Sequence, residues 1–161
     1  MLRLKGVTKK YKEKIIFKES DFFANAGEIV LLMGKSGIGK STLLDILSGI
    51  KLYNSGSYWF KNEEVFPKND KEMSAFRNKY IGYILQDFAL IDDYTVKENI
   101  QLPSLYKNDV DSDKLIKKIK ILTAQFGLEE VYDKKVKEIS GGQKQRVAII
   151  RSIILDPMIY L

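Results

Sequence analysis

The sequence predicts an α/β fold, and three observations support this prediction. A run of the form G-x-x-x-x-G-K-S occupies residues 34–41. An apolar run at residues 28–33, typical of a buried strand, precedes it, and residues 42–47 follow with apolar side chains spaced to cover one helix face. Strand-like runs fill the first part of the chain, whereas helical patterns begin near Thr95.

The residues around this glycine-rich run alternate short apolar segments with polar turns. Before it, we expect a turn at Asn25-Ala26-Gly27 and strands at residues 2–7, 15–17, 22–24 and 28–33. After it, Gly49 is expected to cap the C-terminus of the helix. There follow an expected turn at 54–56, a strand at 57–60, a polar loop at 61–71 that contains Pro67, a short helix at 73–79 and a buried strand at 80–85.

The second half of the chain is predicted to be mainly helical. Thr95 and Glu98 form a capping box, which marks a helix start. Gly127 is expected to end one later helix and Asp156-Pro157 another. We expect helices at residues 113–126 and 140–155 and a buried strand at 158–161. Apolar residues at 4-3-4 spacing define the buried face of the first of these helices: Leu115, Ile119, Leu122 and Phe126.

Composition excludes several classes of site. The chain contains no Cys and no His, which excludes disulfides, thiolate metal sites and a histidine base, so a metal is expected to be an oxygen-bound cation such as Mg²⁺. The net charge is +6, but only four of the 27 basic residues are Arg, so we expect no nucleic-acid partner. No apolar run approaches the ~20 residues of a membrane span. With no signal peptide visible, a soluble cytoplasmic protein is expected.

The glycine-rich run has the chemistry of a phosphate-binding P-loop. Gly34, Gly37 and Gly39 allow positive φ angles, so that backbone N–H groups can point inward around a triphosphate. Lys40 can bind the β- and γ-phosphates, and the Ser41 hydroxyl can ligate Mg²⁺. The alternative is a glycine-rich turn with an incidental lysine and serine. The candidate binding residues are Gly34, Lys35, Ser36, Gly37, Ile38, Gly39, Lys40, Ser41 and Thr42.

A second motif, Ser140-Gly141-Gly142-Gln143, begins the last predicted helix. By itself this motif is explained as a capping box between Ser140 and Gln143. A helix N-terminus with small residues is also an anion site.

Together with the P-loop, this motif makes the chain resemble the ATP-binding cassette (ABC) family of transporter subunits along its whole length, with Ile139 where the family usually has Leu. The resemblance implies a P-loop NTPase (RecA-like) core with an N-terminal antiparallel β subdomain and an inserted helical subdomain at about residues 87–155. The chain would form one ABC ATP-binding domain, 1–161.

The resemblance also implies roles for individual residues. Ser140, Gly141, Gly142 and Gln143 would contact the γ-phosphate of ATP bound to a second subunit, in a head-to-tail homo- or heterodimer. Lys40 and Gln86 would be the catalytic residues, Gln86 as a second Mg²⁺ ligand that relays nucleotide state to the membrane partner. Tyr11 would stack on adenine, unless it is an ordinary strand-turn tyrosine. Arg146 and Arg151 are expected to be structural or interface charges.

One departure from the family pattern concerns hydrolysis. The family's Walker B Asp and the Glu that acts as general base would follow roughly two residues after Leu161, and the switch histidine is absent. We therefore expect these 161 residues to bind ATP and Mg²⁺ but to hydrolyse ATP poorly.

The function implied is that of an ATP-binding subunit that drives an integral-membrane permease from the inner face of the cell membrane. Residues 84–100 look most like subunits that export peptides, bacteriocins or lipoproteins. Two alternatives remain open. One is a soluble ABC-type ATPase acting on DNA or ribosomes, and the other is a non-hydrolytic nucleotide-binding fragment.

Overall fold

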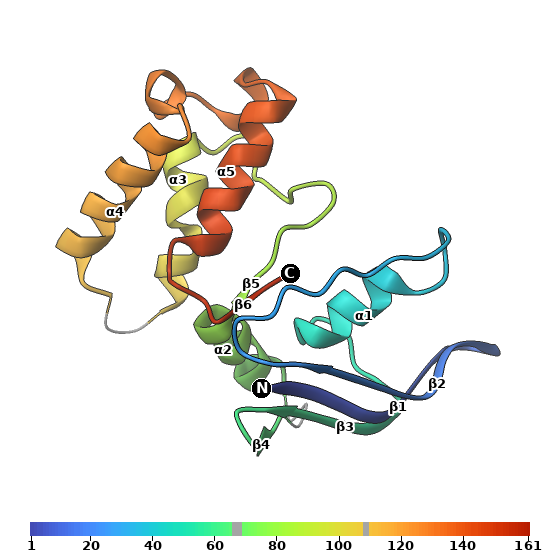
Figure 1. The fold of residues 1–161 in the computed structure, drawn as a ribbon. Helices are drawn as coiled ribbons and strands as arrows, with labels where there is room; N and C mark the ends of the chain where they lie inside the picture. The colour runs from blue at the N-terminus through green and yellow to red at the C-terminus, as the bar shows by residue number, and fades with distance from the viewer. Residues whose placement is uncertain (66–68, 108–109) are drawn as a thin grey trace. The chain divides into compact units, whose positions relative to one another are not determined.

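The computed structural model describes residues 1–65, 69–107 and 110–161. The chain divides into two compact units, Met1–Met73 and Ser74–Leu161 (Figure 1). Helix α2 (Asp70–Tyr80) runs across the boundary. The grouping of all 161 residues into one ABC domain stays a prediction.

The first unit contains a four-stranded sheet in the order β2-β1-β3-β4, with every neighbouring pair antiparallel. Its strands are β1 (Leu2–Tyr11), β2 (Lys14–Ala24), β3 (Ser55–Phe60) and β4 (Glu63–Glu64). The predicted antiparallel N-terminal sheet is thus present. Strand β2 joins the two short runs expected at 15–17 and 22–24, and β4 lies in the expected 61–71 loop, of which residues 66–68, Pro67 included, lie outside the described residues.

Helix α1 (Lys40–Leu47) is tied to this sheet by one buried side chain. Tyr58 on β3 donates its hydroxyl proton to the Leu47 carbonyl oxygen over 2.9 Å. Gly49 follows the helix with φ 72°, as a C-terminal glycine should. The C-terminal end of α1 is therefore fixed on the sheet, while its N-terminal end stays free to build a site.

The prediction of a buried strand at residues 28–33 is wrong. These residues are irregular, and Ile29 and Met33 are 98% and 81% exposed. A strand forms only where a neighbour completes its hydrogen-bond ladder. Among the described residues, no strand pairs with this run, and the sheet of the first unit consists of β1 to β4.

The second unit contains a short parallel pair, β5 (Ile81–Gly82) with β6 (Ile159–Tyr160). Both are shorter than the strands predicted at 80–85 and 158–161, and Tyr80 belongs to α2 instead. The exposed side chains of Met158 and Tyr160 also contradict the expected burial. A parallel pair of two residues on each strand is too short to bury these apolar side chains.

The predicted helices of the second unit are confirmed. They are α3 (Val96–Gln101), α4 (Ser112–Gln125) and α5 (Gly141–Ile153), with short 3₁₀ turns η1 (Leu102–Tyr106), η2 (Glu129–Val131) and η3 (Val136–Glu138). The Thr95–Glu98 capping box is formed in full, and Gly127 follows α4 with φ 60°.

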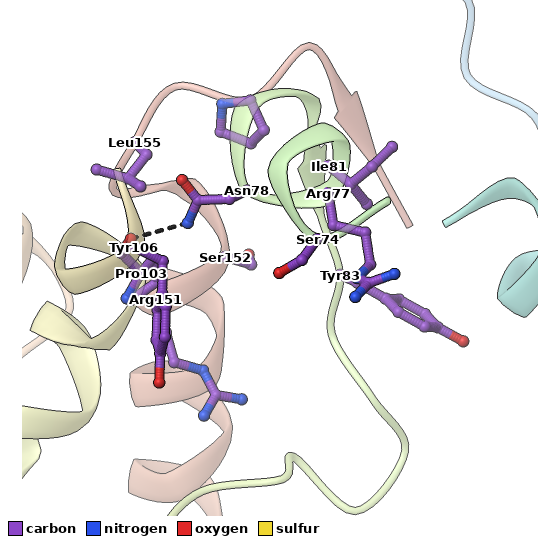
Figure 2. Close-up of a pocket in the computed structure, with 11 residues that line it drawn as sticks. Ser74, Arg77, Asn78, Ile81, Tyr83, Pro103, Tyr106, Arg151, Ser152 and Leu155 are labelled. Carbon is purple, nitrogen blue, oxygen red and sulfur yellow. Dashed lines mark hydrogen bonds between the residues drawn. The ribbon is translucent and has the colours of Figure 1, made fainter. Parts of the chain in front are cut away.

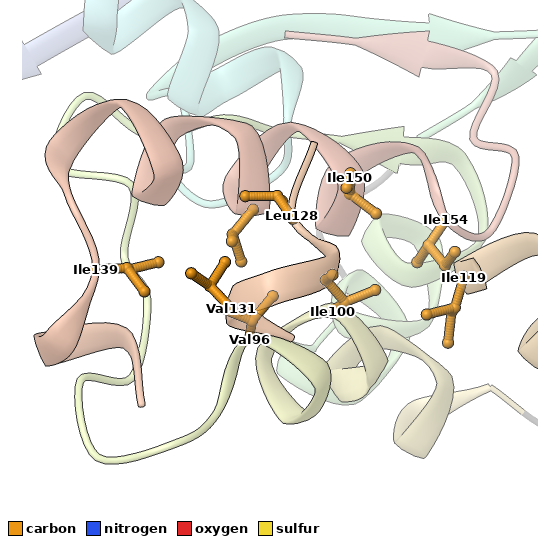
Figure 3. Packing of buried hydrophobic residues seen from close by; sticks show 9 residues of the cluster. Val96, Ile100, Ile119, Leu128, Val131, Ile139, Ile150 and Ile154 are labelled. Carbon is orange, nitrogen blue, oxygen red and sulfur yellow. The ribbon is translucent and has the colours of Figure 1, made fainter. Parts of the chain in front are cut away.

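These helices share one apolar core (Figure 3). Its buried members come from all three helices and the turns between them: Val96, Ile100, Ile119, Leu128, Val131, Ile139, Val147, Ile150 and Ile154. Leu115, Leu122 and Phe126 pack against it, as the 4-3-4 spacing predicts. Burial of Ile139 fixes the chain immediately before the first turn of α5.

Candidate functional site

The P-loop has the backbone that its glycines predict. Gly34, Gly37 and Gly39 have φ values of 152°, 79° and 114°. A side chain at Gly39 would lie 2.6 Å from Ile16 Cγ2 and 3.0 Å from Phe17 Cζ, so β2 packs directly against the loop. Glycine is required at this position both by conformation and by space.

The Lys40 ammonium lies on the inner side of this loop. Its Nζ donates to the Gly34 carbonyl oxygen over 2.8 Å and to the Lys35 carbonyl oxygen over 2.9 Å. Residues five and six positions earlier in the chain are thus drawn around one cation. The loop is therefore curled around the Lys40 ammonium.

The N-terminus of α1 faces the same loop without a side-chain cap. Its N-cap is Gly39, which has no side chain that could accept from the first N–H groups, and its first turn holds no acidic residue. Ser41 is exposed in that turn. The N–H groups of a helix N-terminus, the helix dipole and an ammonium are together chemically suited to phosphate oxygens.

The available donors also fit Mg²⁺. In the part of the chain that the structure describes, no group of three or more Asp, Glu, His or Cys residues could hold a metal ion. Mg²⁺ retains water and shares phosphate oxygens, so a hydroxyl such as that of Ser41 is an adequate protein ligand. The residues present fit a nucleotide-bound magnesium better than a site made of protein carboxylates.

Tyr11 ends β1, in the same unit as the P-loop, and is 41% exposed. Two cations lie over its ring: Lys9 Nζ is 4.6 Å and Lys51 Nζ 6.0 Å from the centroid. Lys51 also pairs with Asp45 over 2.8 Å, and this hydrogen bond raises the pKa of Lys51. The two lysines would be close to any aromatic base stacked on Tyr11, and no local pattern in the sequence predicts them.

The Ser140 motif forms the predicted capping box. The Ser140 N–H donates to Gln143 Oε1 over 2.8 Å, and the Gln143 N–H donates to Ser140 Oγ over 3.3 Å. The cap therefore occupies the side-chain oxygens of both residues. Gly141 and Gly142 are exposed, and a Cβ at Gly141 would meet no atom within 4 Å. This helix end is open on its glycine side.

Gln86 is exposed in a turn that follows β5, in the unit that also contains α5. Arg151 on α5 donates to the carbonyl oxygens of Phe88 and Ala89, just beyond Gln86. The sequence predicts a structural or interface charge at Arg151 but does not predict this contact. No local pattern could have indicated it, since the partners are more than sixty residues apart.

A pocket of about 310 Å³ lies in the second unit, between α2, β5, η1 and α5 (Figure 2). Asn78 donates to the Pro103 carbonyl oxygen over 2.8 Å, which ties α2 to η1 at its edge. Polar and aromatic residues line it, among them Arg77, Tyr83, Tyr106 and Arg151.

No helix of the described residues is long and apolar enough to cross a membrane.

Comparison with known proteins decides the family. The sequence profile described as ABC transporter matches residues 17–161. The chain belongs to the ABC transporter family. Among curated ABC proteins, it is 38% identical to the bacitracin export ATP-binding protein BceA of Halalkalibacterium halodurans, over 99% of this chain and 64% of that protein. It is 37% identical to the lipoprotein-releasing system ATP-binding protein LolD of Cytophaga hutchinsonii, over 99% of this chain and 72% of the relative.

Solved ABC structures confirm the fold class. A dimeric structure of the bacterial ABC transporter cassette MJ0796 is 34% identical, with a TM-score of 0.89 over 99% of this chain and 72% of that chain. A post-hydrolysis dimer of the same cassette, bound to ADP and Pi, has a TM-score of 0.90. The α/β cassette fold predicted from the sequence is therefore correct. The chain spans about two thirds of the length of these ABC relatives.

Proposed function

We propose that this chain binds MgATP at residues 34–42 and serves as the nucleotide-binding subunit of a transporter. The position of the Lys40 ammonium, held by two loop carbonyls beside the uncapped α1 terminus, carries the proposal. Phosphate oxygens would replace neutral acceptors with charged ones and so form stronger hydrogen bonds. Mg²⁺ would be held by the Ser41 hydroxyl, with Gln86 as a second protein ligand. The ion would neutralise part of the phosphate charge.

Calorimetric titration with MgATP tests this proposal. Lys40→Ala is expected to weaken binding at least about tenfold, because a hydrogen bond to a charged group contributes about 1.5–3 kcal/mol. Lys5→Ala is the matched control, since it removes one exposed cation from the same unit but lies outside residues 34–42. Equal affinity in wild type and Lys40→Ala would remove the P-loop assignment.

The nucleotide site is proposed to be shared between two subunits. Tyr11 would stack on adenine, and the N–H groups at Ser140–Gln143 would bind the γ-phosphate held by the P-loop of a partner, in a head-to-tail homo- or heterodimer. The dimeric cassette structures of the relatives support this arrangement.

Gly141→Asp tests the shared site. A carboxylate there would repel phosphate without disturbing the helix, because the space around Gly141 is open and an acidic first turn is favourable. ATP-dependent dimerisation, followed by light scattering, should be lost in Gly141→Asp and retained in Gly141→Ala. Dimerisation of the Asp variant at wild-type ATP concentrations would argue against the shared site.

ATP hydrolysis is proposed for the protein together with the family's Asp and Glu, neither of which is assigned within residues 1–161. A polypeptide of these residues should release negligible phosphate, whereas one extended through that pair should turn over. Lys40→Ala in each form accounts for contaminating ATPases. Lys40-dependent turnover by residues 1–161 would show that the family's Glu is not needed for hydrolysis.

The partner is proposed to be an integral-membrane permease contacted from the cytoplasmic face, with peptides, bacteriocins or lipoproteins as cargo. The names of two relatives, a bacitracin exporter and a lipoprotein-releasing protein, support these cargo classes. A soluble ATPase acting on DNA or ribosomes is the rival. Fractionation of cells that express the tagged protein distinguishes them, because membrane association supports the permease and ribosome or nucleoid association supports the rival.

A further inference from the structure

The turn that carries Gln86 has a backbone that its residues do not favour. The Phe88 N–H donates to the Leu85 carbonyl oxygen over 2.9 Å. Phe88 and Ala89 then adopt φ values of 63° and 43°. Residues with a Cβ seldom adopt this left-handed conformation, and two in succession are rarer still. Contacts from outside the turn are therefore needed to hold it.

Arg151 supplies two of these contacts. Its two terminal nitrogens donate to the Phe88 carbonyl oxygen over 2.6 Å and to the Ala89 carbonyl oxygen over 2.7 Å. The side chain is largely buried, and this burial lowers the pKa of its guanidinium. A planar guanidinium reaches two consecutive carbonyls at once, which a lysine ammonium cannot do with the same geometry. The acceptors are the two residues in the left-handed conformation.

Lys144, two helical turns before Arg151 on α5, makes a similar contact with the same segment of the chain. Its Nζ lies 3.2 Å from an Asp92 carboxylate oxygen. Residues seven positions apart share one face of a helix and are separated by about 10.5 Å along it. The four steps from Phe88 to Asp92 span up to about 14 Å. Residues 88–92 therefore run beside this face of α5.

The chain before Gln86 also contacts α5. A side chain on Gly82, in β5, would collide with the Ser152 carbonyl oxygen and with Pro157. Glycine is thus required by the close approach of this strand to the end of the helix. Helix α5 holds the chain on both sides of Gln86.

We propose that Arg151 is a positioning residue for Gln86. Together with Lys144, it fastens the Gln86 turn to the helix whose N-terminus carries Ser140–Gln143, so that the turn and this helix end move as one body. Its consequence for ATP rests on the proposed function: the orientation of Gln86 toward Mg²⁺ would depend on Arg151.

Hydrogen exchange of the nucleotide-free protein tests the fastening alone. Arg151→Gln should speed exchange in peptides covering residues 86–93 by roughly tenfold, since the hydrogen bonds that hold the turn are lost. Arg151→Lys should restore part of the protection, because one carbonyl can still be reached. Lys117→Gln, which removes an exposed cation from α4, should leave these peptides unchanged. Lys144→Gln, at the first turns of α5, gives a second variant if Arg151→Gln does not fold, and should speed exchange around Asp92.

Titration with ATP in the presence of Mg²⁺ or of a chelator tests the consequence. Arg151→Gln should reduce the Mg²⁺-dependent gain in affinity by about tenfold, as changes behind a metal ligand do. Its affinity for metal-free ATP should stay within twofold of wild type, because the P-loop is untouched. A merely structural role would weaken both affinities together.

Wild-type exchange at residues 86–93 in folded Arg151→Gln and Lys144→Gln would overturn the fastening. Faster exchange with an unchanged Mg²⁺-dependent gain would overturn the positioning role. Absence of ATP binding in the wild type would instead defeat the proposed function, and the exchange data would still decide whether the turn is fastened.

Discussion

The side chain of Asn99 forms reciprocal hydrogen bonds with the backbone of Ile91. Its Oδ1 accepts from the Ile91 N–H over 2.8 Å, and its Nδ2 donates to the Ile91 carbonyl oxygen over 3.0 Å. The same amide nitrogen donates to the Thr95 carbonyl oxygen over 3.0 Å. Asn99 is fully buried. A side chain of α3 thus replaces the strand partner that this part of the chain lacks.

Replacement of Asn99 should destabilise the second unit more than the loss of a small side chain would suggest. Asn99→Ala removes three hydrogen bonds and should lower the free energy of unfolding by about 2–4 kcal/mol, because each hydrogen bond contributes about 0.5–1.5 kcal/mol net. Urea unfolding followed by far-UV circular dichroism measures this loss. Gln125→Ala, at the exposed end of α4, is the control and should have little effect. A loss below that of the control would contradict the bonding scheme.

Tyr58→Phe should loosen α1 from the sheet. The buried hydroxyl is lost and the Leu47 carbonyl keeps no Tyr58 donor, which is expected to cost about 1–2 kcal/mol. Fluorescence of Trp59, the only tryptophan in the chain, reports unfolding of this unit. Tyr160→Phe removes an exposed hydroxyl and should leave the unfolding midpoint unchanged. Equal midpoints for Tyr58→Phe and wild type would show that this hydrogen bond is not important.

Gly39→Ala should affect both stability and nucleotide binding. The positive φ and the collision with Ile16 together are expected to cost about 2–3 kcal/mol. Gly27→Ala is the matched control in the same unit, because φ is 81° but the space around it is open. It should cost only about 1 kcal/mol and leave MgATP binding intact. The comparison fails if the two variants behave alike in calorimetry and in Trp59 fluorescence.

The capping box at Thr95 makes the second unit sensitive to acid. The Thr95 N–H and hydroxyl donate to Glu98 over 2.7 and 2.9 Å, and these hydrogen bonds lower the pKa of Glu98 from 4.5. A lowered pKa in the folded state adds stability above the unfolded pKa, and this stability is lost as pH falls through the folded value. Thermal unfolding should therefore shift less between pH 5 and pH 3 in Glu98→Gln than in wild type. Glu130→Gln controls for loss of a surface carboxylate, and a slope in Glu98→Gln as steep as in this control would contradict the role of the cap.

Local features were predictable from the sequence, and features that depend on a partner were not. The caps at Thr95 and Ser140 and the positive φ of Gly39 follow from residues within four positions, and all three are present. Residues 28–33 resemble a strand in composition, yet strand formation depends on a ladder partner that composition does not encode. The contacts of Arg151 depend on where a distant turn lies, and a single cation in a helical pattern does not reveal this.

The exposed apolar run at residues 28–33 has a practical consequence for solution measurements. An exposed apolar segment outside regular secondary structure can pair with the same segment of another molecule. Such association would grow with protein concentration and with ionic strength, and it would occur without any nucleotide. An apparent dimer of this polypeptide is therefore evidence for ATP-dependent dimerisation only when it dissociates on removal of the nucleotide.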